Sequence, residues 1–288
     1  MHTFSNEIMP LSHPRFAVRE HLRRLLLAIA VLAAPVMLLG QTDEIQVYDA
    51  NIAEPGILNL MIHMNFTPIG RTTPQFPGSI LANDSFQTTA EFGYGVTPWF
   101  EQGLYLPVTT PYSTNKGTTA DGFKIRELFV RPHAEDHTFF YGINFEFSFN
   151  RRYWEERTFT SEIRPIVGLH LKPWDIIFNP ILDNEYYGGV RNLQFNPATR
   201  VAFNFNDRWA VAAEEYDGFG TLRDIVPVSQ QFHEVWAVMD HNNKMVNIEA
   251  GVGVGYTAGG DRLTFKLMLS RDLNKKHEPQ TPEAKPPQ

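Results

Sequence analysis

The feature that most constrains the fold is a regular alternation of apolar and polar residues. In residues 138–150, one set of alternate positions is aromatic or aliphatic, and the positions between them are mostly glycine or polar. The same alternation recurs in residues 57–66, 245–256 and 262–272. Successive side chains of a β-strand point to opposite faces, so each stretch predicts a strand with one apolar face and one polar face.

Composition agrees with alternation rather than with long apolar blocks. Aromatic residues make up 13% of the 288 residues, including 22 Phe and 10 Tyr, although the mean hydropathy is -0.27. A hydrophobic content of 43% is too high for a disordered chain, and the length suits one large β domain. The chain has no cysteine, which excludes disulfides, thiolate metal sites, a cysteine nucleophile and a lipid anchor on cysteine.

The N-terminus has the pattern of a signal peptide. Four arginines, the last of them Arg24, precede an apolar run from Leu25 to Leu39, and Gly40 ends this run before polar residues. The run has 15 residues, short of the roughly 18 that a helix needs to cross a bilayer, so a membrane anchor is the weaker alternative. We therefore predict a signal peptide over residues 1–40 and an exported chain.

The exported chain is acidic. Removing residues 1–40 takes away four arginines and two glutamates, which leaves 21 basic against 30 acidic residues and a net charge of -9. Such a chain is a poor binder of nucleic acid, so we expect no nucleic-acid partner. Residues 274–288 are rich in proline and polar residues, and we expect a disordered tail there.

Strand length separates a membrane barrel from a soluble β-sandwich. Most of the alternating stretches run about ten residues, the length of a tilted transmembrane strand, whereas soluble strands are nearer five or six. The sequence therefore predicts an all-β fold, an antiparallel up-and-down transmembrane β-barrel, over residues 57–273 after a short lead-in at 41–56. About twelve strands are expected: 57–66, 84–96, 99–109, 123–133, 138–150, 158–170, 174–183, 193–205, 208–216, 230–240, 245–256 and 262–272.

The links between these strands alternate between short and long. The short ones are rich in turn formers and fall at Thr97–Pro98, Ala134–His137, Leu171–Pro173, Asn206–Asp207 and His241–Lys244. The long ones fall at 67–83, 110–122, 151–157, 184–192 and 217–229. Outer-membrane barrels have short periplasmic turns and longer external loops, so we expect the short links to face the periplasm.

The polar and aromatic residues have distinct expected positions on this barrel. The polar strand faces carry charges of both signs, which a hydrated or ion-paired lumen accommodates while the apolar faces meet lipid. The predicted lumen-lining residues are Lys124, Arg126, Glu146, Glu162, Arg164, Arg200 and Glu249. An aromatic girdle is expected at Trp99, Trp174 and Trp209, which follow short turns, with Tyr153, Trp154, Tyr186 and Tyr187 near the opposite rim.

Several short stretches resemble a family of uncharacterised bacterial outer-membrane β-barrel proteins and transporters, distantly similar to barrels linked with phenol-degradation pathways. They are Ile45–Tyr48 with Glu54–Gly56, Pro74–Gly78, Leu104–Pro107, Phe140–Gly142, Glu162–Ile166, Asn179–Asp183 and Asp207–Val211. The resemblance implies an outer-membrane location and a barrel architecture, and it carries over no catalytic residue. The tail after the last strand departs from the terminal aromatic that many such barrels present to the assembly machinery.

An enzymatic barrel is the rival interpretation. A base and a nucleophile on one strand would need His and Ser two positions apart, on the same face, and none of the ten histidines has this spacing. Histidines that might line a metal path lack paired ligand spacing, and adjacent carboxylates are expected to pair with lumen cations. These groups are His63, His170 and His233, together with Glu214–Glu215 and Asp183–Glu185. We therefore expect no enzyme, no cofactor and no metal site.

The function predicted from the sequence is that of a narrow passive pore or transporter for small solutes, with a charged lumen, in the outer membrane of a Gram-negative bacterium. A non-conducting structural or binding barrel is the alternative, and an outer-membrane lipid hydrolase is the weaker one. The expected partners are outer-membrane lipid and lipopolysaccharide, the outer-membrane assembly machinery and an unidentified small solute. Twelve strands leave room for a narrow or loop-gated pore.

Overall fold

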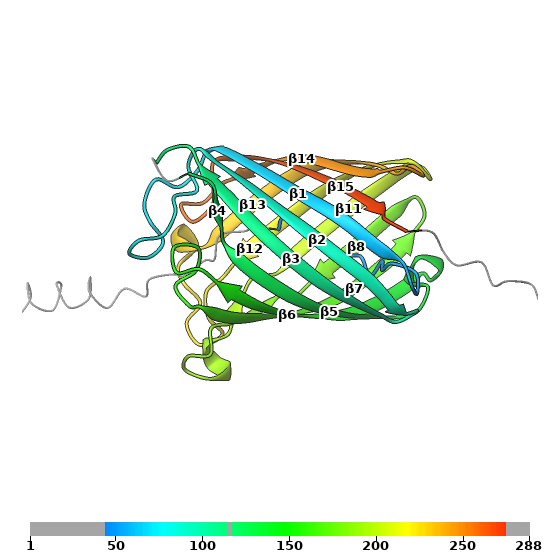
Figure 1. Cartoon of the computed structure of the whole chain (residues 1–288), viewed down its shortest axis with the longest axis horizontal. Coiled ribbons are helices and arrows are strands. Elements are labelled where there is room, and N and C mark those ends of the chain that lie inside the picture. The colour runs from blue at the N-terminus through cyan, green and yellow to red at the C-terminus, as the bar shows by residue number, and fades with distance from the viewer. Residues whose placement is uncertain (1–43, 115–116, 275–288) are drawn as a thin grey trace, which may run out of the picture. The chain divides into compact units, whose positions relative to one another are not determined.

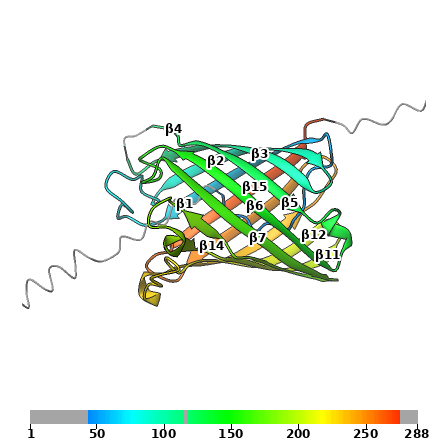
Figure 2. The same cartoon turned by 90° about the horizontal axis from the view of Figure 1, so that it is seen from below.

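The computed structural model describes residues 44–114 and 117–274, and its strands form a closed antiparallel β-barrel (Figures 1 and 2). Closure is made by β1 pairing with β15, and β8 joins β7 to β11 on the other side. The twelve barrel strands are β1 (Leu58–Ile69), β2 (Ser85–Thr97), β3 (Phe100–Pro111), β5 (Gly122–Val130), β6 (Phe139–Asn150), β7 (Phe159–Leu171), β8 (Trp174–Asn179), β11 (Ala198–Asn206), β12 (Trp209–Gly218), β13 (Phe232–His241), β14 (Asn247–Gly255) and β15 (Leu263–Asp272).

Three short strands extend the sheet at one end of the barrel. Strand β4 (Thr119–Ala120) pairs with β3, while β9 (Leu182–Asn184) and β10 (Gln194–Phe195) pair with each other next to β7. The described chain also contains three single 3-10 turns in the links between strands: η1 (Ala134–Asp136), η2 (Val190–Asn192) and η3 (Val228–Gln230). No helix in the described chain is long and apolar enough to cross a membrane.

The predicted all-β barrel is confirmed, and its strands follow the expected order. Two expected strands, 174–183 and 193–205, are each broken by a proline. Pro180 separates β8 from β9, and Pro197 separates β10 from β11. Proline has no backbone N–H to give to a neighbouring strand, so the hydrogen-bond ladder stops at each of these positions.

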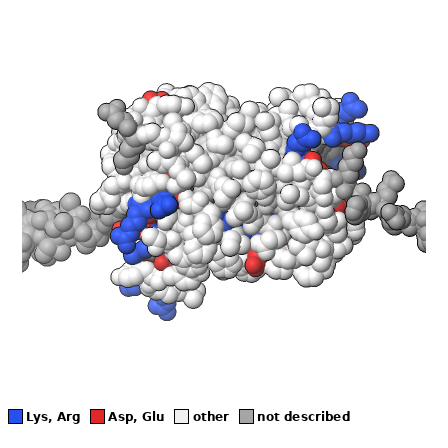
Figure 3. Space-filling view, viewed as in Figure 1, with Lys and Arg blue, Asp and Glu red and all other residues white. Residues whose placement is uncertain are grey.

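The two faces of the wall differ as the alternation predicts. Along β6, Phe139 and Tyr141 are about half exposed on the outside, whereas Phe140 and Asn144 are fully buried on the inside. On the side of the barrel shown in Figure 3, charged side chains gather mostly toward the two ends, and the band between them is mostly uncharged. Such a band is the surface that a membrane barrel presents to lipid.

The two ends of the barrel have different links. One end, here the short-turn end, carries the tight connections and the exposed side chains of Trp99, Trp174 and Trp209. The opposite, long-loop end carries the longer links and the β9–β10 hairpin. Trp154 does not belong to an exposed rim at the long-loop end, because its side chain is buried. The expected leader at residues 1–40, and residues 275–288 of the expected tail, lie outside the described residues.

A charge on the outer band tests whether this surface meets hydrocarbon. Val252 lies near the middle of β14, pairs with Ala237 and Phe265, and is partly exposed on the outer face. We expect Val252→Arg to lower the free energy of unfolding in a lipid bilayer by about 2–4 kcal/mol, because an arginine at mid-depth loses its hydration. Urea titration of the refolded barrel in vesicles measures this, with Val252→Leu as the apolar control. Equal stability of both variants would place this band outside a bilayer.

Candidate functional site in the lumen

The chain segment before the first strand lies inside the barrel. Its apolar side chains Ile45, Val47, Tyr48 and Ala50 are all at least nine-tenths buried. Ile45 packs in a cluster with inward residues of β11, β12 and β13, and the other three pack against inward residues of β5, β6, β7, β8 and β11. We call residues 44–57 the lumen segment. It has no strand or helix of its own and fills the interior with apolar contacts.

Wall side chains, rather than wall backbone, hold the first part of this segment. Asn179 makes two hydrogen bonds to Tyr48: its Oδ1 accepts from the Tyr48 N–H at 2.7 Å, and its Nδ2 donates to the Tyr48 carbonyl at 3.0 Å. Lys266 Nζ donates to the Ile45 carbonyl and Arg164 Nη1 to the Gln46 carbonyl, both at 3.1 Å. The segment is therefore bound at Ile45, Gln46 and Tyr48 by polar groups of three different strands.

The tyrosine at the centre of the segment makes further polar contacts. The hydroxyls of Tyr48 and Tyr105 lie 2.7 Å apart within hydrogen-bonding distance. The Arg164 guanidinium lies 4.2 Å from the centroid of the Tyr48 ring, and that of Arg126 lies 5.6 Å from it. Two buried cations thus face one ring, an arrangement whose attraction grows when water is excluded.

Lumen charges form ion-paired networks with the segment at their edge. Lys266 Nζ lies 2.6 Å from a carboxylate oxygen of both Glu214 and Glu249. Arg200 pairs with the same two glutamates and with Asp240. All of these groups are at least four-fifths buried at the side chain. Buried charges are tolerated only when paired, so this network belongs to the folded lumen as one unit.

A second network lies beside the segment on the β1–β5 side. Arg126 pairs with Glu91, at 2.7 Å, and with Glu101. His63 Nε2 lies 2.8 Å from the other Glu91 oxygen, and Glu101 accepts a hydrogen bond from the Ala53 N–H at 2.6 Å. The part of the lumen segment nearest the short-turn end therefore binds this network through Ala53, while its earlier residues bind Arg164 and Lys266 deeper in the barrel.

Glycines on neighbouring strands make room for the large inward side chains. A Cβ on Gly253 would lie 2.1 Å from the Trp236 ring, and one on Gly168 would lie 2.1 Å from the Phe140 ring. A Cβ on Gly103 would lie 2.7 Å from Arg126 Nε. The repeated glycines of β14, which the sequence pattern places on the inward face, thus leave space for side chains that fill the lumen.

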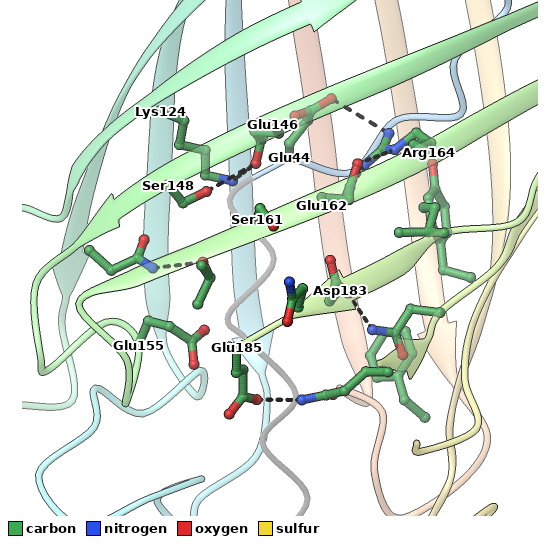
Figure 4. Close-up of a pocket in the computed structure, with 18 of the residues that line it drawn as sticks. Glu44, Lys124, Glu146, Ser148, Glu155, Ser161, Glu162, Arg164, Asp183 and Glu185 are labelled. Carbon is green, nitrogen blue, oxygen red and sulfur yellow. Dashed lines mark hydrogen bonds and ion pairs between the residues drawn. The ribbon is translucent and has the colours of Figure 1, made fainter. Parts of the chain in front are cut away.

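Two cavities lie toward opposite ends of the barrel. The long-loop cavity has a volume of about 200 Å³ and is lined by Lys124, Glu146, Glu162 and Arg164 among others (Figure 4). The short-turn cavity, about 420 Å³, is lined by Arg126, Arg200, Glu249 and much of the lumen segment. Gln46 lines both cavities. The segment therefore stands between them, and all seven predicted lumen residues line one or the other.

The three histidines considered as a metal path lie apart. His63 is on β1, His170 on β7 and His233 on β13, and each has its own carboxylate partner. In the described chain, two other groupings bring three ligand atoms within 4.8 Å: His133–Glu135–Asp136 and Glu215–Asp217–His233. In the second, His233 uses Nδ1 toward Asp217 and Nε2 toward Gln231, so protein groups already occupy both ring nitrogens.

The sequence did not predict the lumen segment or the roles of Lys266 and Asn179, two of the wall residues that bind it. Residues 41–56 were expected to be a lead-in, but four apolar side chains within Ile45–Ala50 are more than an exposed lead-in needs. Lys266 lies on the predicted polar face of its strand, so its inward direction was expected but its partners were not. Asn179 gave no signal beyond preceding a proline.

Comparison with solved structures finds similar folds among outer-membrane barrels. An outer membrane channel from Pseudomonas putida F1 matches with a TM-score of 0.53 and 10% identity, over 80% of this chain and 100% of that one. The NalP translocator domain from Neisseria meningitidis (TM-score 0.38, 8% identity, 77% and 89% covered) and LpxR from Salmonella typhimurium (0.37, 7%, 74% and 99%) also match. No protein-family model and no curated protein matches the sequence. At 10% identity, the Pseudomonas match shows a shared fold.

Removing the lysine at the centre of the first network tests its contribution. We expect Lys266→Met to lower the free energy of unfolding by about 3–5 kcal/mol, because Glu214 and Glu249 then share Arg200 as their remaining close cation. Adding Glu214→Gln removes one of the stranded charges and should restore part of the loss. Urea unfolding of the two variants beside the unsubstituted protein measures both effects, and a Lys266→Met barrel of unchanged stability would contradict the pairing argument.

Proposed function

We propose that the protein is a narrow channel for small polar solutes in the outer membrane of a Gram-negative bacterium, and that its lumen segment is the gate. The observation that carries the proposal is the pair of polar cavities separated by a chain segment. The short-turn end would face the periplasm and the long-loop end the exterior, as the link lengths and tryptophans suggest. The predicted leader would direct export, and lipopolysaccharide and the assembly machinery would be the partners of the barrel in that membrane.

The way the segment is attached supports a gate. Between residues 44 and 53, the hydrogen bonds that join its backbone to the wall are made with side chains, those of Asn179, Arg164, Lys266 and Glu101. Backbone pairing with a strand begins at Gly56, which donates to the Gly95 carbonyl at 2.8 Å. The segment can therefore leave the lumen without breaking any strand-to-strand ladder. Its hinge would lie at the pairing with Gly95.

The charged lumen would set which solutes pass. Wall cations and carboxylates line both cavities, so a passing solute exchanges its water for paired charges rather than for an apolar surface. A twelve-strand barrel lies between the eight strands that side chains alone can fill and the sixteen of an open porin. This size explains why an added segment is needed to close the lumen.

A non-conducting barrel is the second candidate, and the buried ion networks favour it. Lys266 and Arg200 bind carboxylates from several strands and would hold the wall rigid whether or not a path opens. In this case the lumen segment would be a permanent part of the core. The two candidates differ in one property, namely whether releasing the segment produces a conducting path.

Conductance of the purified barrel in planar bilayers tests the proposal. Asn179→Ala removes two hydrogen bonds to Tyr48, each contributing about 0.5–1.5 kcal/mol, so we expect the open-to-closed ratio to rise roughly 5- to 150-fold. Deleting residues 45–53 should leave a channel that no longer closes. Asn204→Ala is the matched control, because Asn204 bonds to Asp175 and the Pro173 carbonyl, away from the segment. A folded deletion variant without added conductance would exclude the gate and favour the non-conducting barrel.

A further inference from the structure

The long-loop cavity contains more carboxylates than cations. Seven acidic side chains line it: Glu44, Glu146, Glu155, Glu162, Asp183, Glu185 and Asp217. Three basic side chains line it: Arg71, Lys124 and Arg164. Six of the carboxylates come from the lumen segment, from β6 and β7, from β9 and from the links after β6 and β9 (Figure 4), and Asp217 lies on β12. The excess is therefore a property of the cavity as a whole and not of one loop.

Each of the three basic side chains already forms an ion pair with a carboxylate. Lys124 Nζ lies 2.9 Å from Glu146, and Arg164 donates through Nε and Nη2 to the two oxygens of Glu162. Arg71 pairs with Asp261, outside the cavity. Within the described chain, no ion pair is found for Glu155 or Asp183, and the nearest base to Glu185 is Arg157 at 3.8 Å. Negative charge in this cavity is left without a close counter-ion.

Glu44 adds an unfilled acceptor deep in the cavity. Its side chain is only 3% exposed, and its Oε1 accepts no hydrogen bond from any described residue. The nearest cationic nitrogen is Arg164 Nη1, at 3.8 Å, and this atom donates instead to the Gln46 carbonyl. A buried carboxylate oxygen in this state is costly, and a bound donor would relieve the cost.

We infer that the long-loop cavity binds a small aliphatic amine, most simply a diamine, as the solute of the proposed channel. An ammonium group has three N–H donors and no acceptor, which matches a lining rich in carboxylates and the unfilled Glu44 Oε1 within it. Trp154 and Ile181 are buried in the same lining and provide an apolar surface for the methylene chain. The inference deepens the proposed function, since it names the class of solute.

The spacing of the carboxylates separates this ligand from a bare metal ion. In the described chain, the groups of three that bring ligand atoms within 4.8 Å of one another include Asp217 alone among the seven cavity carboxylates, and Asp217 is already paired with His233. A metal ion needs its oxygen ligands at about 2.0–2.6 Å and thus close together. Carboxylates spread around a cavity of about 200 Å³ instead fit two ammonium groups joined by a short chain.

The pH dependence of binding follows from Glu155, in the link between β6 and β7. Burial, together with the charges of Glu185 and Asp183, raises its pKa to about 7, and a hydrogen bond from the Glu156 N–H and the charge of Lys124 limit this rise. Because this pKa lies above its ordinary value, the group is mostly neutral at pH 5.5 and charged at pH 8. Binding of a cation should therefore strengthen as pH rises through 7.

Titration calorimetry on the purified full barrel in detergent, with 1,4-diaminobutane as the probe and 1,4-butanediol as its uncharged analogue, tests the inference. We expect the diamine to bind and the diol not to bind. Glu155→Gln combined with Asp183→Asn should weaken diamine binding roughly 10- to 100-fold, as expected for lost hydrogen bonds to charged groups. Glu156→Gln is the matched control, because Glu156 is exposed and does not line the cavity.

Four results would overturn the inference: no diamine binding, equal binding of the diol, unchanged affinity in the double variant, or an equal loss in Glu156→Gln. Between pH 5.5 and 8 the affinity should rise in the unsubstituted protein and rise much less in the double variant, because burial and the charge of Glu162 also raise the pKa of Asp183 to about 7. The heat-dependent gel shift of each variant shows whether the barrel is folded before it is titrated. Calorimetry does not need an open path through the lumen. A folded barrel that binds diamine but does not conduct would therefore contradict the proposed channel and leave the amine site standing. A barrel that conducts but does not bind diamine would contradict the amine site and leave the channel standing.

Discussion

The interior of this barrel depends on the pairing of the charges that its wall points inward. Strands that alternate apolar and polar residues must send the polar set into the lumen, where Lys266, Arg200, Arg126 and Arg164 are all nearly buried. A buried charge requires partners, and the wall supplies them across two or three strands at a time. The donors that remain on Arg164 and Lys266 bind the carbonyls of the lumen segment. The same side chains therefore pair the charges of the wall and hold the segment that occupies the lumen.

Barrel size makes the second half of this arrangement necessary. A lumen bounded by twelve strands is wider than inward side chains fill on their own, even with Trp236 and Phe140 lying across neighbouring glycines. The lumen segment supplies the missing apolar volume through Ile45, Val47 and Tyr48. Because it is held mainly by side chains, it fills the interior without joining the wall. The result is a continuous closed sheet around a core segment that wall side chains hold in place.

The sequence predicts the wall well because a β-strand converts alternation directly into faces. The apolar set that includes Phe139 and Tyr141 could be assigned outward, and Arg200 and Glu249 inward, from spacing alone. The breaks at Pro180 and Pro197 were missed, although proline's missing N–H made them foreseeable. The lumen segment could not be predicted, since its contacts join residues far apart in the sequence, by more than a hundred positions for Tyr48 and Asn179. Alternation contains no information about which distant side chain an irregular segment will meet.

The absence of native cysteine allows a direct test of the central claim, that the lumen segment occupies the barrel interior. Single cysteines at Val47, which is 5% exposed, and at Asn51, which is exposed toward the short-turn cavity, can each be treated with a water-soluble thiol reagent in the folded barrel. The account predicts that the cysteine at position 51 reacts readily, and that the one at position 47 reacts only after unfolding. Equal, rapid modification of both positions in the folded barrel would show that the segment lies outside the lumen and would contradict the account.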